Sequence, residues 1–139
     1  MKKVVLALLL VFYVASMSSA ANFVEVYRNK DDGYLIYIDL DTLQNKGEYV
    51  TCWSKWIPRG KELERINKME KRKVSYFMHY SAYKLYERQD QLLQAHVYFK
   101  NGENETSHIS NLAVNGWSEI VPQTVGEIVW ESVKAIAGH

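Results

Sequence analysis

Val74–Gly102 reads VSYFMHYSAYKLYERQDQLLQAHVYFKNG and contains two long strand patterns that run back to back. In the second pattern, apolar residues alternate with polar ones at the period of a half-buried strand. The first pattern alternates in the same way, so each strand can be covered on one face and be available for binding on the other. The apolar row of the second strand is Leu93, Ala95, Val97 and Phe99, and the first strand has an apolar row, Val74, Tyr76, Met78, Tyr80 and Ala82, and an aromatic and polar row, Ser75, Phe77, His79, Ser81 and Tyr83.

The Asn-Gly pair that ends this stretch predicts a hairpin, and the loop length decides its register. A two-residue loop would place Ile109 on the solvent face. A three-residue loop, Lys100–Gly102, with its glycine left-handed, pairs Phe99 with Glu103 and returns Ile109 to the apolar face, so we prefer it. The returning segment, Glu103–Ser110, is so polar that we expect it at the edge of the sheet.

The remaining elements predict an α+β fold with about six antiparallel strands and a C-terminal helix packed on one face of the sheet. Thr124 followed by Glu127 is a capping box. The helix that it starts carries an apolar stripe of Val125, Ile128, Val129, Val133 and Ile136, and Gly126 in its first turn suggests close packing on the sheet. Arg59–Lys73 is expected to be a mobile crossover. Further strands are expected at Phe23–Tyr27, Tyr34–Leu40 and Glu48–Ile57, beside Val74–Tyr86 and Gln91–Lys100.

Residues 1–20 have the pattern of a secretory signal peptide. Lys2 and Lys3 precede the apolar run Val4–Val14, and small residues lead to a cleavage position after Ala20. The run is shorter than the roughly 20 residues that span a bilayer, so we expect no stable membrane span. No cysteine at its end could accept a lipid. We expect an exported chain, in the periplasm, at the cell surface or secreted.

Residues 21–139 have the length of one domain, large enough for its own core. Removal of Lys2 and Lys3 from the 17 basic residues leaves 15 against 16 acidic ones, so no global charge recruits nucleic acid. Cys52 is the single cysteine of the chain, and an internal disulfide is therefore impossible. We favour a buried thiol over an intermolecular bridge because free cysteine behaves as a small hydrophobe.

Patterns typical of catalysis, cofactor binding and metal binding are missing from this sequence, and we expect no enzyme. It has neither a nucleophile elbow nor a glycine loop for phosphate. The aspartates around Gly33 lack the distal glutamate of a calcium loop and are read as turn residues. A zinc site would need His79, His96 and His108 to meet, and nothing in the sequence places His79 beside the other two.

Two groups of residues could bind a partner. The first is a basic segment that could hold an acidic polysaccharide, with a solvated loop as the alternative: Arg59, Lys61, Arg65, Lys68, Lys71, Arg72 and Lys73. The second is an aromatic group that could hold a partner chain, with core packing as the alternative: Phe77, Tyr83, Tyr98 and, less directly, Trp53.

Four segments, in this order, resemble the surface-adhesin protein E family. They are Tyr34–Leu43, Asn45–Trp56, the Val97–Gly102 hairpin, and Trp117 leading into Val121–Glu127, which reads VPQTVGE. The resemblance implies a six-stranded antiparallel sheet with a C-terminal helix, export to the bacterial envelope, adhesion to host extracellular-matrix proteins, and homodimers in some members.

This chain departs from the family in two ways. Many relatives carry one cysteine on the strand after the crossover and another at the end of the helix, whereas Tyr80 and its neighbours and Ala135–His139 include none. The adhesin after which the family is named resembles a lipid-anchored protein, whereas this sequence has no cysteine at the end of its apolar run to accept a lipid. We therefore expect an exported adhesin-like binding module, with a structural or assembly role in the envelope as the alternative. In that alternative, self-association would use the Glu103–Ser110 edge or Cys52.

Overall fold

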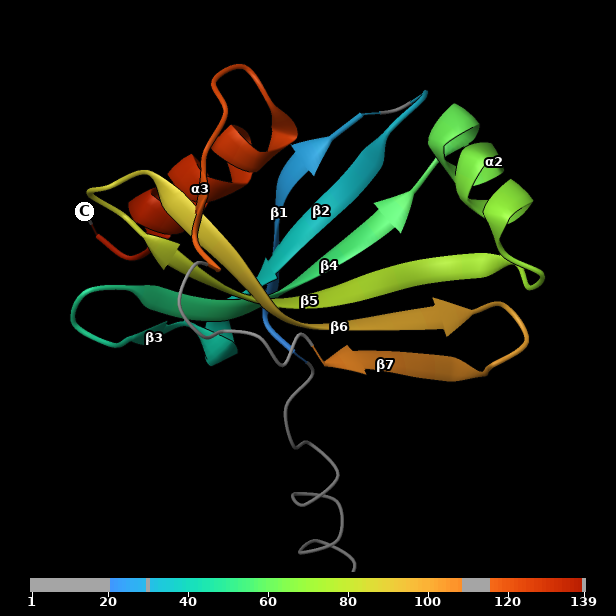
Figure 1. Cartoon of the computed structure of the whole chain (residues 1–139), viewed down its shortest axis with the longest axis horizontal. Coiled ribbons are helices and arrows are strands. Elements are labelled where there is room, and N and C mark those ends of the chain that lie inside the picture. The colour runs from blue at the N-terminus through green and yellow to red at the C-terminus, as the bar shows by residue number, and fades with distance from the viewer. Residues whose placement is uncertain (1–20, 30, 109–115, 139) are drawn as a thin grey trace, which may run out of the picture.

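The computed structural model describes residues 21–29, 31–108 and 116–138, and shows one antiparallel sheet with two α-helices (Figure 1). The main strand order is β1-β2-β4-β5-β6-β7, while β3 pairs with β4 and β8 pairs with β6. This confirms the predicted fold class. Residues 1–20, predicted to be a signal peptide, and residues 109–115 lie outside the described residues. The elements are β1 Phe23–Arg28, β2 Tyr34–Asp39, η1 Leu40–Thr42, β3 Gln44–Asn45, β4 Val50–Pro58, α2 Gly60–Met69, β5 Val74–Lys84, β6 Gln89–Phe99, β7 Asn104–His108, β8 Ser118–Glu119 and α3 Val125–Ile136.

The β6–β7 hairpin has the register of the three-residue loop. The Phe99 amide donates to the Glu103 carbonyl over 2.9 Å, and Gly102 has a φ of +88°. Tyr98 lies opposite Asn104, and β7 is the edge strand of the main order, as predicted. The expected pairing of Ile109 falls outside the described residues.

The C-terminal helix α3 begins at the predicted cap and packs its apolar side on the sheet. Thr124 Oγ1 accepts a hydrogen bond from the Glu127 amide over 3.3 Å. Glu127 reaches back to the Gln123 amide rather than to that of Thr124. Val129 and Val133 are buried, but so is Trp130, which the predicted stripe omitted. The stripe was wrong for Ile128 and Ile136, which are exposed.

The segment predicted to be a mobile crossover contains a regular helix, α2, and its cap explains the error. Arg59 at the N-cap makes no side-chain cap. The cap comes from the β1–β2 turn, where Asp32 Oδ1 accepts from the Lys61 amide over 3.0 Å. A Cβ on Gly60 would lie 1.7 Å from the Asp31 carbonyl oxygen, so only glycine fits this junction. Ile66 then anchors the helix in a small apolar cluster.

The main core lies between α3 and the sheet and includes Cys52, whose predicted burial is confirmed at 0% exposure. Phe77 lies opposite Val97, so the aromatic and polar row of β5 shares the helix side with the apolar row of β6. The other row, with Tyr76 and Met78, consequently turns away from the helices, contrary to our expectation for β5. Irregularities in the β5–β6 register, at Val74/Tyr76 and Tyr80/Ser81, disturb the simple alternation on which that expectation rested.

Candidate binding surfaces

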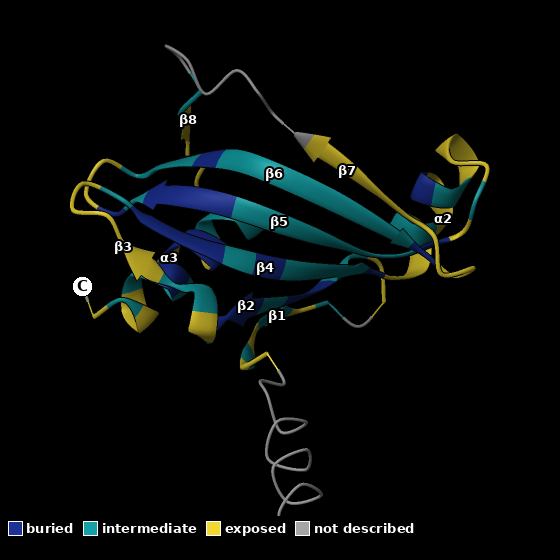
Figure 2. Ribbon diagram, turned by 90° about the horizontal axis from the view of Figure 1, so that it is seen from below, coloured by how far each residue is buried: buried dark blue, intermediate teal, exposed yellow. Residues whose placement is uncertain are grey.

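One face of the sheet carries a row of rings that neither helix covers, and no helix crosses in front of the middle of β4, β5 and β6 in Figure 2. We call this surface the open aromatic face. Its members come from three neighbouring strands and are all half-buried, so each is partly accessible. They are Trp53 of β4, Tyr76, Met78 and Tyr80 of β5, and His96 and Tyr98 of β6.

The rings of the open aromatic face pack against one another. Trp53 stacks on Tyr80 with 5.2 Å between centroids and 29° between planes. Tyr76 stacks on Tyr98 at 4.5 Å and 15°. Side chains stand roughly perpendicular to a sheet, so stacked neighbours direct ring edges, rather than ring faces, to solvent. The surface therefore offers apolar edges with polar tips.

Polar groups hold this array in place. His96 Nδ1 lies 2.7 Å from Thr106 Oγ1, and Nε2 lies 2.8 Å from Gln94 Nε2. Lys55 Nζ stands 4.2 Å from the centre of the Tyr76 ring, a cation–π distance. A shallow hollow of about 310 Å³ opens beside these rings, lined by Ala21, Phe23, Asp39, Trp53, Met78, His96 and Tyr98.

The predicted aromatic group does not form one surface. Tyr83 is 3% exposed and belongs to the main core, which was the alternative for this group. Phe77 lines a hollow on the helix side, and Tyr98 lies on the open aromatic face. His96 lies on the polar row of β6 with Tyr98, as predicted, but was not counted in the aromatic group. Tyr76 and Tyr80 were missed because β5 was assigned from its own alternation. Pairing of β5 with the apolar row of β6 would have placed them correctly.

The predicted basic group is partly neutralised within the protein. Lys61 pairs with Asp32 at 3.3 Å, and Arg65 pairs with Glu62 at 2.6 Å. Arg72 binds two carboxylates of the edge hairpin, Glu103 at 2.8 Å and Glu105, and its guanidinium lies 3.9 Å from the Phe99 ring centre. Within the described residues, ion pairs are absent only from Arg59, Lys68, Lys71 and Lys73 of this group.

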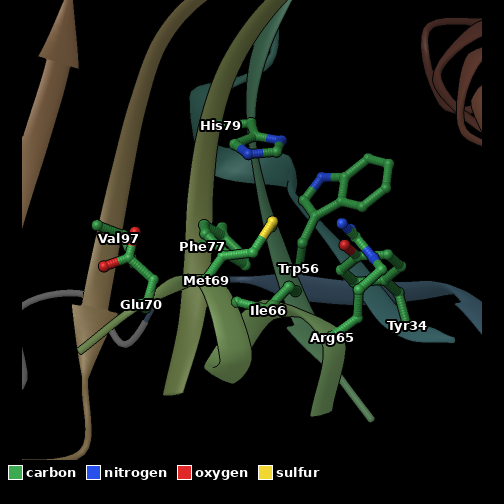
Figure 3. Close-up of a pocket in the computed structure, with 9 residues that line it drawn as sticks. All are labelled: Tyr34, Trp56, Arg65, Ile66, Met69, Glu70, Phe77, His79 and Val97. Atoms are coloured by element: carbon green, nitrogen blue, oxygen red, sulfur yellow. The ribbon is translucent and has the colours of Figure 1, made fainter. Parts of the chain in front are cut away.

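A second surface lies on the other side of the sheet, where α2 and α3 stand apart (Figure 1). A hollow of about 390 Å³ lies against α2, and one of about 170 Å³ lies against α3. Both are lined by Trp56 and His79, so they adjoin, and we call them together the inter-helix trough. In Figure 3, His79 lies at the end of the larger hollow away from Ile66 and Arg65. The other residues of the larger hollow are Tyr34, Met69, Glu70, Phe77 and Val97, and those of the smaller are Ser81, Tyr83, Asp90, Leu92, Gly126 and Val129.

Burial and pairing set the charges around the trough. Burial lowers the pKa of His79 to about 4, so the imidazole is neutral at pH 7. Tyr34 donates to Glu62 over 2.7 Å. Hydrogen bonds from Arg65 and then Tyr34 lower the pKa of Glu62 to about 2, and burial, helped by Glu62, raises the pKa of Tyr34 to about 12. Trp56 donates from Nε1 to Ser54 over 2.8 Å, which fixes the indole.

The titratable groups of the described residues form no cluster of three or more metal-ligating side chains. His79 is on the helix side and His96 is on the open face, so the sheet separates two members of the zinc trio that the sequence raised. The Cys52 thiol is buried in the core, and burial with the nearby Asp39 charge raises its pKa to about 12. This thiol is therefore a poor nucleophile and a poor partner for an intermolecular bridge.

Comparisons with known proteins support the fold. Neither a protein-family model nor a curated protein sequence matches this chain. Among solved structures, it is similar to crystal form II of Haemophilus influenzae protein E, with a TM-score of 0.51 and 13% sequence identity over 86% of this chain and 100% of that one. Among the described residues, none of the helices is long and apolar enough to cross a membrane. The chain has a protein E-like fold.

Proposed function

We propose that this protein is an exported, adhesin-like binding module of the bacterial surface, related to the surface-adhesin protein E family, and that its open aromatic face contacts a protein. The protein E-like fold and the sequence motifs support the relationship. Signal-like residues 1–20 support export. The partner class that the resemblance implies is a host extracellular-matrix protein.

The geometry of the open aromatic face is the observation that carries this proposal. A platform for nucleic-acid bases needs free ring faces on which they can stack. Here four rings each have one face covered by a neighbouring ring, in the Trp53–Tyr80 and Tyr76–Tyr98 pairs. Tyrosine and tryptophan edges combine apolar area with a hydrogen-bonding tip, and both residues are enriched at protein–protein contacts. A protein surface therefore suits this array better than a nucleic acid.

The basic group supports an acidic polysaccharide less well. Three of its seven members are engaged with carboxylates of this chain, and Arg72 also stacks on Phe99. An acidic polymer would have to displace these partners or use the four remaining cations, and exposed charges contribute little at physiological salt. We therefore assign the principal contact to the aromatic rings.

The test is binding of the purified protein to a panel of immobilised extracellular-matrix proteins, at low and physiological salt. We expect at least one saturable interaction that persists at physiological salt. The double substitution Tyr76→Ser/Tyr98→Ser should weaken it at least about tenfold, the scale of an interface hot spot. Ile128→Ser, an exposed residue on α3, is the matched control and should bind normally. Absence of binding to the whole panel would favour a structural or assembly role, and loss only with Lys68→Ser/Lys71→Ser would favour an acidic polymer.

A further inference from the structure

Gly126 in the first turn of α3 is not explained by close packing. We expected it to mark a tight contact with the sheet because glycine is less favourable than alanine inside a helix. A Cβ at this position would lie 3.5 Å from Thr124 Oγ1, an ordinary contact, and would meet nothing else within 4 Å. Gly126 does line the smaller hollow of the inter-helix trough. The missing side chain therefore leaves this hollow open.

The trough changes in character along its length. The larger hollow, against α2, has an apolar floor of aromatic and aliphatic side chains, including Trp56, Phe77 and Val97. The smaller hollow, against α3, adds polar groups, including Ser81 and Asp90. A ligand that fits both must have an apolar tail and a polar head.

The charged groups around the smaller hollow indicate whether the polar head of the ligand is a cation or an anion. His79 is neutral at pH 7, and the positive end of the α3 dipole is already occupied by Glu127, which accepts from the Gln123 amide and pairs with Arg88 at 2.6 Å. The half-buried Asp90 carboxyl has no ion pair within the described residues. Burial raises its pKa, so its charged form would gain from a counter-ion.

Among the described residues that line it, the larger hollow brings no unpaired positive charge that could hold an anionic head. Arg65 at its rim is held by Glu62, and Glu70 also lines it. An anionic head would therefore face Asp90 at one end and paired or acidic groups at the other. Carboxylates and aromatic rings, by contrast, attract organic cations, and Trp56 and Tyr83 line the hollow that contains Asp90.

We propose that the inter-helix trough binds a small organic cation with a single apolar tail, the tail lying against α2 and the ammonium head beside Asp90. This site is on the opposite side of the sheet from the open aromatic face and is independent of the proposed adhesive function. A free amphiphile fits better than a two-chain lipid because the two hollows, at about 390 Å³ and about 170 Å³, have room for one short chain and its head.

Calorimetric titration of the purified protein with three matched probes tests the proposal: octyltrimethylammonium, octanoate and octanol, each below its aggregation concentration. We expect one-to-one saturable binding of the cation, weaker binding of the alcohol and none of the carboxylate. Asp90→Asn should weaken cation binding about tenfold because the counter-charge is lost. Asp41→Asn, which removes an exposed carboxylate outside the trough, should leave it unchanged. Phosphatidylcholine vesicles should not bind.

Gly126→Leu tests whether the smaller hollow holds the ammonium head. The leucine side chain would fill this hollow from a position that has free space around it. We expect this variant to melt no lower than wild type and to lose cation binding, while Gly126→Ala keeps part of it. The proposal is overturned if octanoate binds as well as the cation, if Asp90→Asn or a folded Gly126→Leu binds like wild type, or if the cation does not saturate a single site. Binding of the vesicles alone would also overturn it.

Discussion

The two faces of this sheet use aromatic residues in opposite ways. On the helix side, Tyr83 and Trp130 are almost fully buried, and Trp130 donates from its indole nitrogen to the Lys84 carbonyl over 3.2 Å. On the open aromatic face, Trp53 and Tyr98 are only half-buried, and each stacks on a tyrosine of the neighbouring strand. Aromatic content alone therefore does not locate a core. The position of the two helices decides which rings stabilise the fold and which stay available to a partner.

The largest expected effect on stability is at the side of α3 that packs on the sheet. Val129 is 2% exposed, so Val129→Asp would bury a carboxylate among apolar groups. We expect a loss of about 4 kcal/mol or more, a large share of the roughly 5–15 kcal/mol that stabilises a domain. Chemical denaturation followed by circular dichroism measures it. Ile128→Asp, one position earlier but exposed, should change little, and equal losses in both variants would contradict the assigned helix face.

Acid should destabilise the helix side through His79. Its folded pKa of about 4 lies below the ordinary value of 6.5, so the unfolded chain binds more protons between these values. The stability that comes from burying a neutral imidazole is fully present above pH 6.5 and is lost as the pH falls towards 4. The unfolding free energy changes by on the order of 2 kcal/mol over this range. Glu62, whose pKa is lowered from 4.5 to about 2, also stabilises the fold, but this stabilisation is lost only as the pH falls below about 4.5.

Unfolding free energies at pH 7, 6 and 5 would show this loss. His79→Asn should flatten the profile in that window. Ile128→Ser, an exposed substitution that leaves His79 in place, should keep the wild-type slope. If His79→Asn retains the full acid sensitivity, then His79 is not the group responsible.

The cap of α2 comes from a distant turn, and its removal should have a moderate effect. Asp32→Ala removes the acceptor for the Lys61 amide and the ion pair with the Lys61 side chain. We expect about 1 kcal/mol of destabilisation, the usual value for an N-cap. Hydrogen exchange should increase first at the start of α2. Unchanged exchange there would show that the helix does not depend on this cap.

Local rules were sufficient for much of this fold. The β6–β7 register was predicted by requiring Ile109 to lie on the apolar face. The start of α3 was predicted from Thr124 and Glu127. Both predictions were possible because the interacting residues are close in sequence. The helix α2 could not be predicted in this way, since Asp32 lies 29 positions before the amide that it caps. The β5 faces failed for a similar reason: the strand's own alternation misled, while its pairing with β6 and its irregular register decided the outcome.

The candidate sites depended even more on long-range contacts. Arg72 was grouped with other cations by sequence proximity, but the fold brings it to Glu103 and Glu105 on another strand. Gly126 signalled an unusual position correctly, but only the placement of α3 shows that it borders a hollow. The open aromatic face is assembled from three strands. Their relative register depends on how the strands pair and cannot be derived from the sequence of any one of them.

The smallest expected effect on stability concerns the open aromatic face itself. Tyr98→Ser removes a half-buried ring that stacks on Tyr76, and we expect a loss of about 1 kcal/mol, the scale of one aromatic pair. Thermal unfolding measures it against Val129→Asp. A loss as large as that of Val129→Asp would mean that the open face is part of the core.

Oxidative footprinting of the protein, alone and with a bound matrix protein, tests the central claim most directly, because it reads both faces in one measurement. We expect the bound partner to protect Trp53, Tyr76 and Tyr98 on the open aromatic face and to leave the oxidation of Trp56 and Phe77 in the trough unchanged. Protection confined to the trough or to the exposed side of α2, with the open-face rings still oxidised at the free rate, would contradict it.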